Sequence, residues 1–209
     1  MPTMADDLTV GEASVIADLR PDQINDAIDR KRIPSRWVTS KGRTRLVRRE
    51  GLVVFIIEKS VATQVPAKVR QRWYDQLAKG GSLRRVAATD AKTNVTYEVD
   101  VWRYRAAIDK RLKELKAAKR LIVEDPKIQA GAATFRGTRI LVHPIADALA
   151  AGISESELLE DYPRLTPSML EAARIWRLAY PRRGRPRSKA PWHATSAADK
   201  PGPWRRPAS

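Results

Sequence analysis

The amino-acid composition changes after Pro181, and this boundary limits how much of the chain can fold. The 28 residues that follow hold eight basic side chains, one acid and five prolines, with no apolar period. Such a segment buries too little apolar surface to offset its ordering entropy, so we expect residues 182–209 to be disordered in isolation. A folded core is therefore expected only between residues 8 and 181, after a disordered N-terminus at 1–7.

Two tryptophans, Trp192 and Trp204, stand in this basic segment. Tryptophan and arginine anchor protein interfaces, and guanidinium groups suit acidic pockets. We interpret residues 182–209 as an arm that binds an acidic partner. A basic tail that only adds affinity for nucleic acid is the alternative.

Charge is distributed unevenly along the rest of the chain. The net charge is +16, with +11 in residues 1–120, −2 in 121–180 and +7 in 181–209. Polyanion binding is therefore expected in the N-terminal half and the tail. The absence of cysteine fits a reducing compartment, and we expect a cytoplasmic protein without a signal peptide or a membrane span.

Two short helices are expected near the N-terminus. Thr9 followed by Glu12 fits a capping box, and Pro21 suits the first turn of a second helix. Apolar residues at helical spacing follow each start and end before Pro34. Two short helices joined by a tight turn are typical of a helix-turn-helix.

A basic hairpin is expected next, from Trp37 to Val47, with a turn at Lys41-Gly42. This order resembles the excisionase-like winged helix-turn-helix domains. A small helical bundle with a solvated charged face is the alternative. Polar second-helix residues can reach base edges and wing cations can contact phosphates. The predicted DNA-binding residues are Gln23, Asn25, Arg30, Lys41, Arg43, Arg45, Arg48 and Arg49.

The remainder of this module, residues 8–115, is less regular. Periodicity does not decide whether the apolar segment 52–57 is a helix or a strand. A helix is expected from Pro66 to Leu77, and alternation predicts a half-buried strand between Val95 and Val101. A strongly basic helix, 103–120, then links to the next module.

Residues 116–181 favour a β-hairpin followed by three helices. Apolar residues flank Arg136-Gly137, which suggests the hairpin. The predicted helix starts are His143-Pro144, Ser154 with Glu157, and Thr166-Pro167, and Gly152 ends the first helix. The expected fold class is α+β, mainly helical.

The motifs of this module occur in a specific order. They are Asp125-Pro126, Gly131, Arg136-Gly137-Thr138-Arg139-Ile140, Gly152-x-Ser154, Leu158-Leu159-Glu160-Asp161-Tyr162-Pro163 and Leu165-Thr166-Pro167. Over about 60 residues they resemble the small domain known as domain of unknown function 433 and, in chains built like this one, VapB-type antitoxins. Ala132-Ala133 and Ile175-Trp176 depart from the usual residues without threatening the expected fold.

This resemblance implies a non-enzymatic antitoxin that neutralises a cognate PIN-like ribonuclease toxin and represses its own operon by binding operator DNA. PIN-like toxins hold a divalent cation among carboxylates, and an inserted arginine would compensate their charge. The predicted toxin-binding residues are Arg182, Arg183, Arg185, Arg187, Trp192 and Trp204.

Other surfaces of the module carry further expectations. The apolar face of the last helix is longer than a small core needs, which predicts a homodimer formed through Met169, Ala173, Trp176 and Tyr180. Arg136 and Arg139 either touch phosphate or hold the hairpin through backbone carbonyls. Residues 144–162 also have a helix-turn-helix rhythm, but their acids would repel phosphate, which favours DNA binding by the N-terminal half.

Enzymatic chemistry is not indicated. The two histidines, His143 and His193, lack neighbouring metal-ligand partners, and the sequence has no phosphate loop, nucleophile elbow or dinucleotide fingerprint. We expect no catalytic residues, no metal and no cofactor. A stand-alone DNA-binding transcriptional regulator with a basic tail is the main alternative function, and an RNA-associated scaffold is a third.

Overall fold

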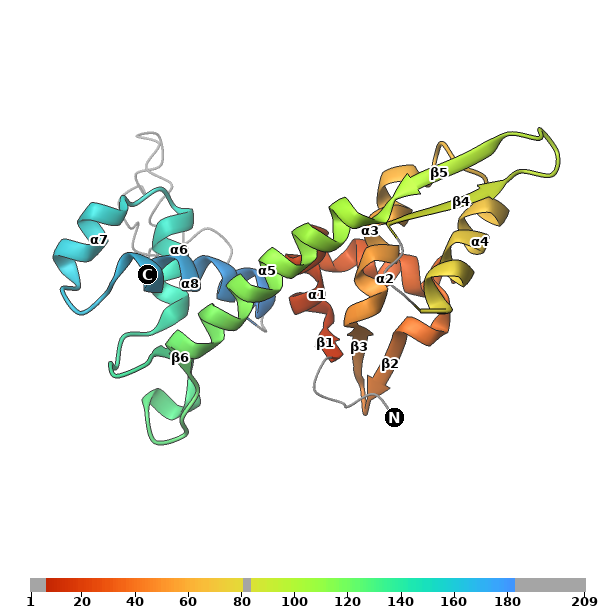
Figure 1. Ribbon diagram of the computed structural model, residues 1–209. Coiled ribbons are helices and arrows are strands. Elements are labelled where there is room, and N and C mark those ends of the chain that lie inside the picture. The colour runs from red at the N-terminus through yellow and green to blue at the C-terminus, as the bar shows by residue number, and fades with distance from the viewer. Residues whose placement is uncertain (1–6, 81–83, 183–209) are drawn as a thin grey trace, which may run out of the picture.

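The computed structural model describes residues 7–80 and 84–182, which are mainly helical with three small antiparallel sheets (Figure 1). The helices are α1 (Val10–Ala17), α2 (Pro21–Asp29), α3 (Leu52–Val61), α4 (Ala67–Ala78), α5 (Val101–Leu121), α6 (Val142–Ala150), α7 (Glu155–Asp161) and α8 (Pro167–Ala179). The strands are β1 (Asp7–Thr9), β2 (Val38–Lys41), β3 (Thr44–Arg48), β4 (Arg85–Thr89), β5 (Thr96–Asp100), β6 (Ile122–Val123) and β7 (Thr134–Phe135). The predicted α+β class is confirmed.

The first two helices begin where the sequence predicts. Thr9 Oγ1 accepts the Glu12 N–H at 3.2 Å, and Glu12 Oε2 accepts the Thr9 N–H at 2.7 Å, so the capping box is complete. Pro21 opens α2, where the missing N–H costs no hydrogen bond. β1, which the sequence did not reveal, pairs with β3 to give a sheet of order β1-β3-β2.

The apolar segment 52–57 is helical and forms most of α3. Most of its side chains are buried, because α3 packs against both α1 and α5. A buried ion pair then joins α3 to α4: Arg70 Nε donates to Glu58 Oε2 at 2.9 Å, and the Tyr74 hydroxyl donates to the same oxygen at 2.6 Å. Because every partner is hydrogen-bonded, the buried charges are compensated.

The predicted strand at 95–101 is shorter in the structure. Val95 lies outside β5 and is 45% exposed, and Val101 is the first residue of α5. Alternation alone missed this end because Asp100 caps α5, its carboxylate accepting the Trp102 N–H at 3.0 Å. β5 pairs with β4, and β4 packs along α4, where Gln76 Nε2 donates to Ala87 O at 2.7 Å (Figure 1).

The last part of the described chain has its own core. β6 pairs with β7, while the turn at Arg136-Gly137 is closed by a Phe135 N–H bond to Ile140 O at 3.1 Å and one bridge, Thr134 to Leu141. The predicted hairpin is therefore present only in part. The three predicted helices are α6, α7 and α8, and a positive φ of 93° at Gly152 follows the end of α6.

Two hydrophobic cores are joined by shared helices. α5 contributes Leu112 and Leu115 to the first core and Ala118 to the second, so the predicted boundary at 115/116 falls within one helix. α8 belongs mainly to the second core but also packs on α1 and α5 (Figure 1). At the closest point, a Cβ on Gly11 would overlap the Ala179 carbonyl oxygen.

This packing gives the residues of the predicted dimer face contacts within the chain itself. Ala173 and Trp176 are 0% and 7% exposed within the second core, and Met169 packs against it. Tyr180 is half-buried and its hydroxyl donates to Glu12. The apolar face of α8 covers α1 and α5 as well as its own module, and a homodimer through these four residues stays a prediction.

Within the described ranges, no helix combines the length and apolar character that crossing a membrane requires.

Candidate nucleic-acid interface

The hairpin β2–β3 occupies the segment for which the sequence predicts a wing, and it keeps that name below. Its register pairs Val38 with Val47 and Lys41 with Thr44, and Gly42 takes a φ of 60° in the turn. Directly paired residues of antiparallel strands project to the same side of a sheet. Arg45 therefore lies on the face that buries Val47, towards α2, whereas Lys41 and Arg48 lie on the opposite, exposed face.

The predicted wing cations differ in whether they have a hydrogen-bond or ion-pair partner. Among the described residues, no ion pair or side-chain hydrogen bond engages Lys41, Arg43 or Arg48, and all three are exposed. Arg45 instead pairs with Asp29 at 2.7 Å, which raises the pKa of its guanidinium, and donates to Asn25 Oδ1 at 3.2 Å. Arg45 and Asn25, both predicted to contact DNA, are thus bonded to each other.

Arg48 lies apart from the other two unpaired cations. It is four residues from Thr44 along β3, roughly 13 Å in an extended strand, and pairs in register with Asp7 of β1. The tip of the wing, with Lys41 and Arg43, is therefore the part with cations available to a phosphate.

Helix α2 carries more acid than a DNA-facing helix would be expected to carry. Three aspartates line it, and each has an arginine partner: Asp22 with Arg20 at 2.8 Å, Asp26 with Arg30 at 2.6 Å and Arg32 at 2.9 Å, and Asp29 with Arg45 at 2.7 Å. The Arg20 partner holds the pKa of the Asp22 carboxyl below its ordinary value. Because each carboxylate is compensated, the helix does not present an unopposed negative face to a polyanion.

The remaining predicted helix residues have local roles. Gln23 Oε1 accepts the Arg20 N–H at 3.0 Å, so this side chain helps to cap α2. Arg30 is held by Asp26 one turn earlier. A base or phosphate contact by Gln23, Arg30 or Arg45 would require exchange of an existing partner.

A hollow of about 600 Å³ separates α2 from the wing, and Lys31 lines it without a side-chain partner among the described residues. The other lining residues are Ile28, Ile33, Pro34, Ser35, Val38, Thr39, Ser40 and Arg45. Sequence reasoning missed Lys31, although the run Arg30-Lys31-Arg32 directly after the helix was a usable signal. Lys31 adds a further exposed cation, beside the hollow, to the two at the wing tip.

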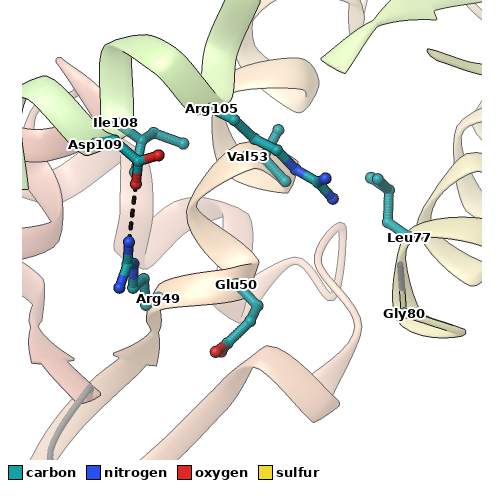
Figure 2. A pocket seen from close by; sticks show the side chains of 8 residues that line it. All are labelled: Arg49, Glu50, Val53, Leu77, Gly80, Arg105, Ile108 and Asp109. Carbon is teal, nitrogen blue, oxygen red and sulfur yellow. Dashed lines mark hydrogen bonds and ion pairs between the residues drawn. The ribbon is translucent and has the colours of Figure 1, made fainter. Parts of the chain in front are cut away.

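Arg49 is placed away from these three cations. Its guanidinium pairs with Asp109 of α5 at 2.8 Å beside another hollow of about 480 Å³, between α3, α4 and α5 (Figure 2). Figure 2 shows Arg105 extending from α5 towards Leu77 across the same hollow. Arg49 therefore links the end of the wing to α5, which sequence proximity to the wing did not reveal.

Of the predicted toxin-binding residues, the structure describes Arg182 alone. Its Nη1 lies 3.7 Å from Asp147 of α6. Burial, with the nearby Arg182 charge, lowers the pKa of His143. The other five lie outside the described residues: Arg183, Arg185, Arg187, Trp192 and Trp204. Within the described ranges, no group of three or more His, Asp or Glu side chains is placed to hold a metal ion.

Comparison with known proteins identifies one segment. Residues 122–176 match the DUF433 family, described as "Protein of unknown function". The DUF433 segment contains β6, β7, α6, α7 and most of α8, so the resemblance drawn from its motifs is supported at this level. No solved structure matches the chain.

The similarity to one curated protein extends beyond the DUF433 segment. An uncharacterised protein of Sinorhizobium fredii, y4eO, is 29% identical over 195 residues, covering 90% of this chain and 87% of that protein. The similarity therefore includes most of the N-terminal module as well as the DUF433 segment.

Proposed function

We propose that this chain is a DNA-binding antitoxin: its N-terminal module binds operator DNA, and its C-terminal part neutralises a ribonuclease encoded beside it. The observation that carries the DNA-binding part is the basic rim, defined as Lys31, Lys41 and Arg43. All three cations are exposed, and Lys31 also lines the hollow between α2 and the wing. None has a side-chain partner among the described residues.

The arrangement of the rim suits a nucleic-acid backbone. Phosphates attract cations that are not already neutralised, whereas Arg30 and Arg45 are occupied by aspartates. A helix beside a hairpin can place one element in a groove and the other along the adjacent strand. The ion pair of Arg45 with Asp29 and its hydrogen bond to Asn25 connect the wing to that helix.

The neutralising part rests on two further observations. The DUF433 segment resembles, in its motif order, the module of VapB-type antitoxins, and the sequence after Pro181 is rich in arginine and tryptophan. Both suit an acidic partner of the PIN-like ribonuclease class. A stand-alone regulator, in which residues 182–209 only add affinity for DNA, is the second candidate.

The DNA-binding proposal is tested by removing the charges of the rim. The variant K31Q/K41Q/R43Q should bind a duplex from the region upstream of its own reading frame more weakly. The slope of log K against log salt should fall by about 0.9 for each lost phosphate contact, roughly 2.7 in total. Electrophoretic mobility shifts over a salt series would measure this slope.

A matched variant controls for net charge. Lys68, Lys79 and Lys92 are exposed and lie on α4 and the β4–β5 hairpin, outside the rim. K68Q/K79Q/K92Q removes the same charge and should change the slope much less. Equal slopes for the two triple variants would show that only net charge matters, and the rim proposal would be wrong.

A further inference from the structure

The two arginines of the loop Arg136-Gly137-Thr138-Arg139 differ in their contacts. Arg136 Nε donates to the Arg120 carbonyl oxygen at 2.7 Å, so this side chain holds the loop to the end of α5. Arg139 is exposed and has no side-chain partner among the described residues. The alternatives left open by the sequence therefore separate: Arg136 has a structural role, and Arg139 is available to a ligand.

A second unpaired arginine lines the same hollow as Arg139. Arg164, from the loop between α7 and α8, borders a space of about 440 Å³ together with Ile128, Gly137, Thr138 and Ile140. Arg164 is exposed and also lacks a partner in the described part of the chain, although Asp161 lies three residues before it. Two arginines 25 positions apart in the sequence thus line one hollow, and no carboxylate is among its lining residues.

The loops that carry these arginines are held by local hydrogen bonds. Thr138 Oγ1 donates to Phe135 O at 2.9 Å and accepts the Ile140 N–H at 3.1 Å. Leu165 N–H donates to Tyr162 O at 2.8 Å on the other side. Gly137 has a φ of 77° and no side chain to fill the space. The hollow is therefore preformed on both sides, which lowers the entropy cost of binding.

We propose that Arg139 and Arg164 form a receptor for a carboxylate side chain of an acidic protein partner. Guanidinium groups bind carboxylates with charge-assisted, bidentate hydrogen bonds, and Ile128 and Ile140 offer an apolar wall to the residues beside that carboxylate. The volume is large for a lone ion and fits a side chain with its neighbours.

The acids of α7, the helix that precedes Arg164 in the chain, favour a peptide over nucleic acid. Glu157, Glu160 and Asp161 of α7 are exposed and have no side-chain partner among the described residues. A nucleic-acid backbone carries closely spaced phosphates, some of which would face these acids. A single carboxylate gains the attraction of both guanidiniums with less of this repulsion. The site is separate from the basic rim, so the proposal does not depend on DNA binding.

The experiment uses the full chain and a fluorescein-labelled peptide of twelve residues that holds a single aspartate among leucine and serine residues. Fluorescence anisotropy should show binding of this peptide and not of the matched peptide with asparagine in place of that aspartate. R139Q/R164Q should raise its Kd about tenfold, as expected for loss of charge-assisted hydrogen bonds. R139K/R164K, which keeps the charge without the planar fork, should give a smaller loss.

K127Q controls for the loss of a nearby positive charge, because Lys127 is exposed, lies beside Ile128 and does not line the hollow. It should leave the peptide Kd unchanged. In the unaltered protein, the Nε–H resonances of Arg139 and Arg164 should shift on peptide addition, which tests the site even if a variant folds poorly. Unchanged resonances, equal Kd values for R139Q/R164Q and the unaltered protein, or shifts produced only by a DNA duplex would overturn the proposal.

Discussion

At the residue scale, Glu12 connects three parts of the molecule. It closes the capping box of α1, accepts the Tyr180 hydroxyl from the end of α8 and pairs with Lys119 of α5. Burial acts to raise the pKa of this carboxyl, but the hydrogen bonds from Lys119, Tyr180 and Thr9 outweigh it, so the pKa is lowered. Burial and the bond to Glu12 raise the pKa of Tyr180, which therefore remains a donor.

We predict that E12Q lowers the free energy of unfolding by about 1.5–3 kcal/mol at pH 7, because charge-assisted hydrogen bonds are lost. A carboxyl with a depressed pKa stabilises fully above its unfolded value, near 4.5, and loses this contribution as pH falls through the lower folded value. The difference from the unaltered protein should thus shrink on acidification from pH 7 to below pH 4.5. Urea unfolding over this range measures it. A difference independent of pH would contradict the role of the charge.

The exposed, unpaired Glu160 supplies the control for this change. E160Q should leave stability near its original value throughout, since an exposed carboxylate without a partner contributes little.

At the element scale, α8 determines how the two cores meet. Its last turn packs against α1 so closely that a side chain at Gly11 would overlap the Ala179 carbonyl oxygen. Backbone atoms cannot rotate away as a side chain can, so relief requires the helices to separate.

We predict that G11A destabilises the protein by about 1–3 kcal/mol, as overpacking does. The sign of the change is diagnostic, because replacing glycine by alanine in a helix otherwise stabilises it by up to about 1 kcal/mol. Urea unfolding monitored by circular dichroism measures the effect. A stabilised G11A protein would mean that α1 and α8 do not touch at this position.

At the scale of the whole molecule, α5 and α8 pack against both the N-terminal module and the DUF433 segment. The two parts are therefore not separate domains joined by a linker. Tyr180, two residues before Arg182, bonds to Glu12 of α1. In the proposed antitoxin, the partner-binding sequence would start next to the DNA-binding module.

We predict that the variant with lysine at positions 182, 183, 185 and 187 loses the ability to neutralise the neighbouring ribonuclease while its DNA binding stays unchanged. Lysine keeps the charge but lacks the planar donors that grip carboxylates. Growth of cells that co-express the ribonuclease, together with mobility shifts, measures both activities. Full rescue by this variant, or by a chain ending at Pro181, would exclude a neutralising role for these arginines.

The sequence predicted local features well, because local chemistry determines them. The Thr9–Glu12 capping box, Pro21 at the start of α2 and the wing turn at Gly42 depend on residues within a few positions of one another. The DUF433 segment was recognised for a similar reason, since its motifs lie in one continuous stretch. Of the candidate rim, Lys41 and Arg43 were predicted on the same local grounds.

Only the tertiary structure decided which of the basic residues already have a carboxylate partner and which apolar helix faces are buried. Contacts between distant segments determine that 52–57 is a helix and that α8 buries its apolar face on α1 and α5. They also determine that Asp29 pairs with Arg45 and Asp109 with Arg49. An apolar stripe or a basic side chain specifies what kind of partner it needs. It does not specify which segment supplies that partner, because packing of the whole chain chooses among many chemically equivalent ones.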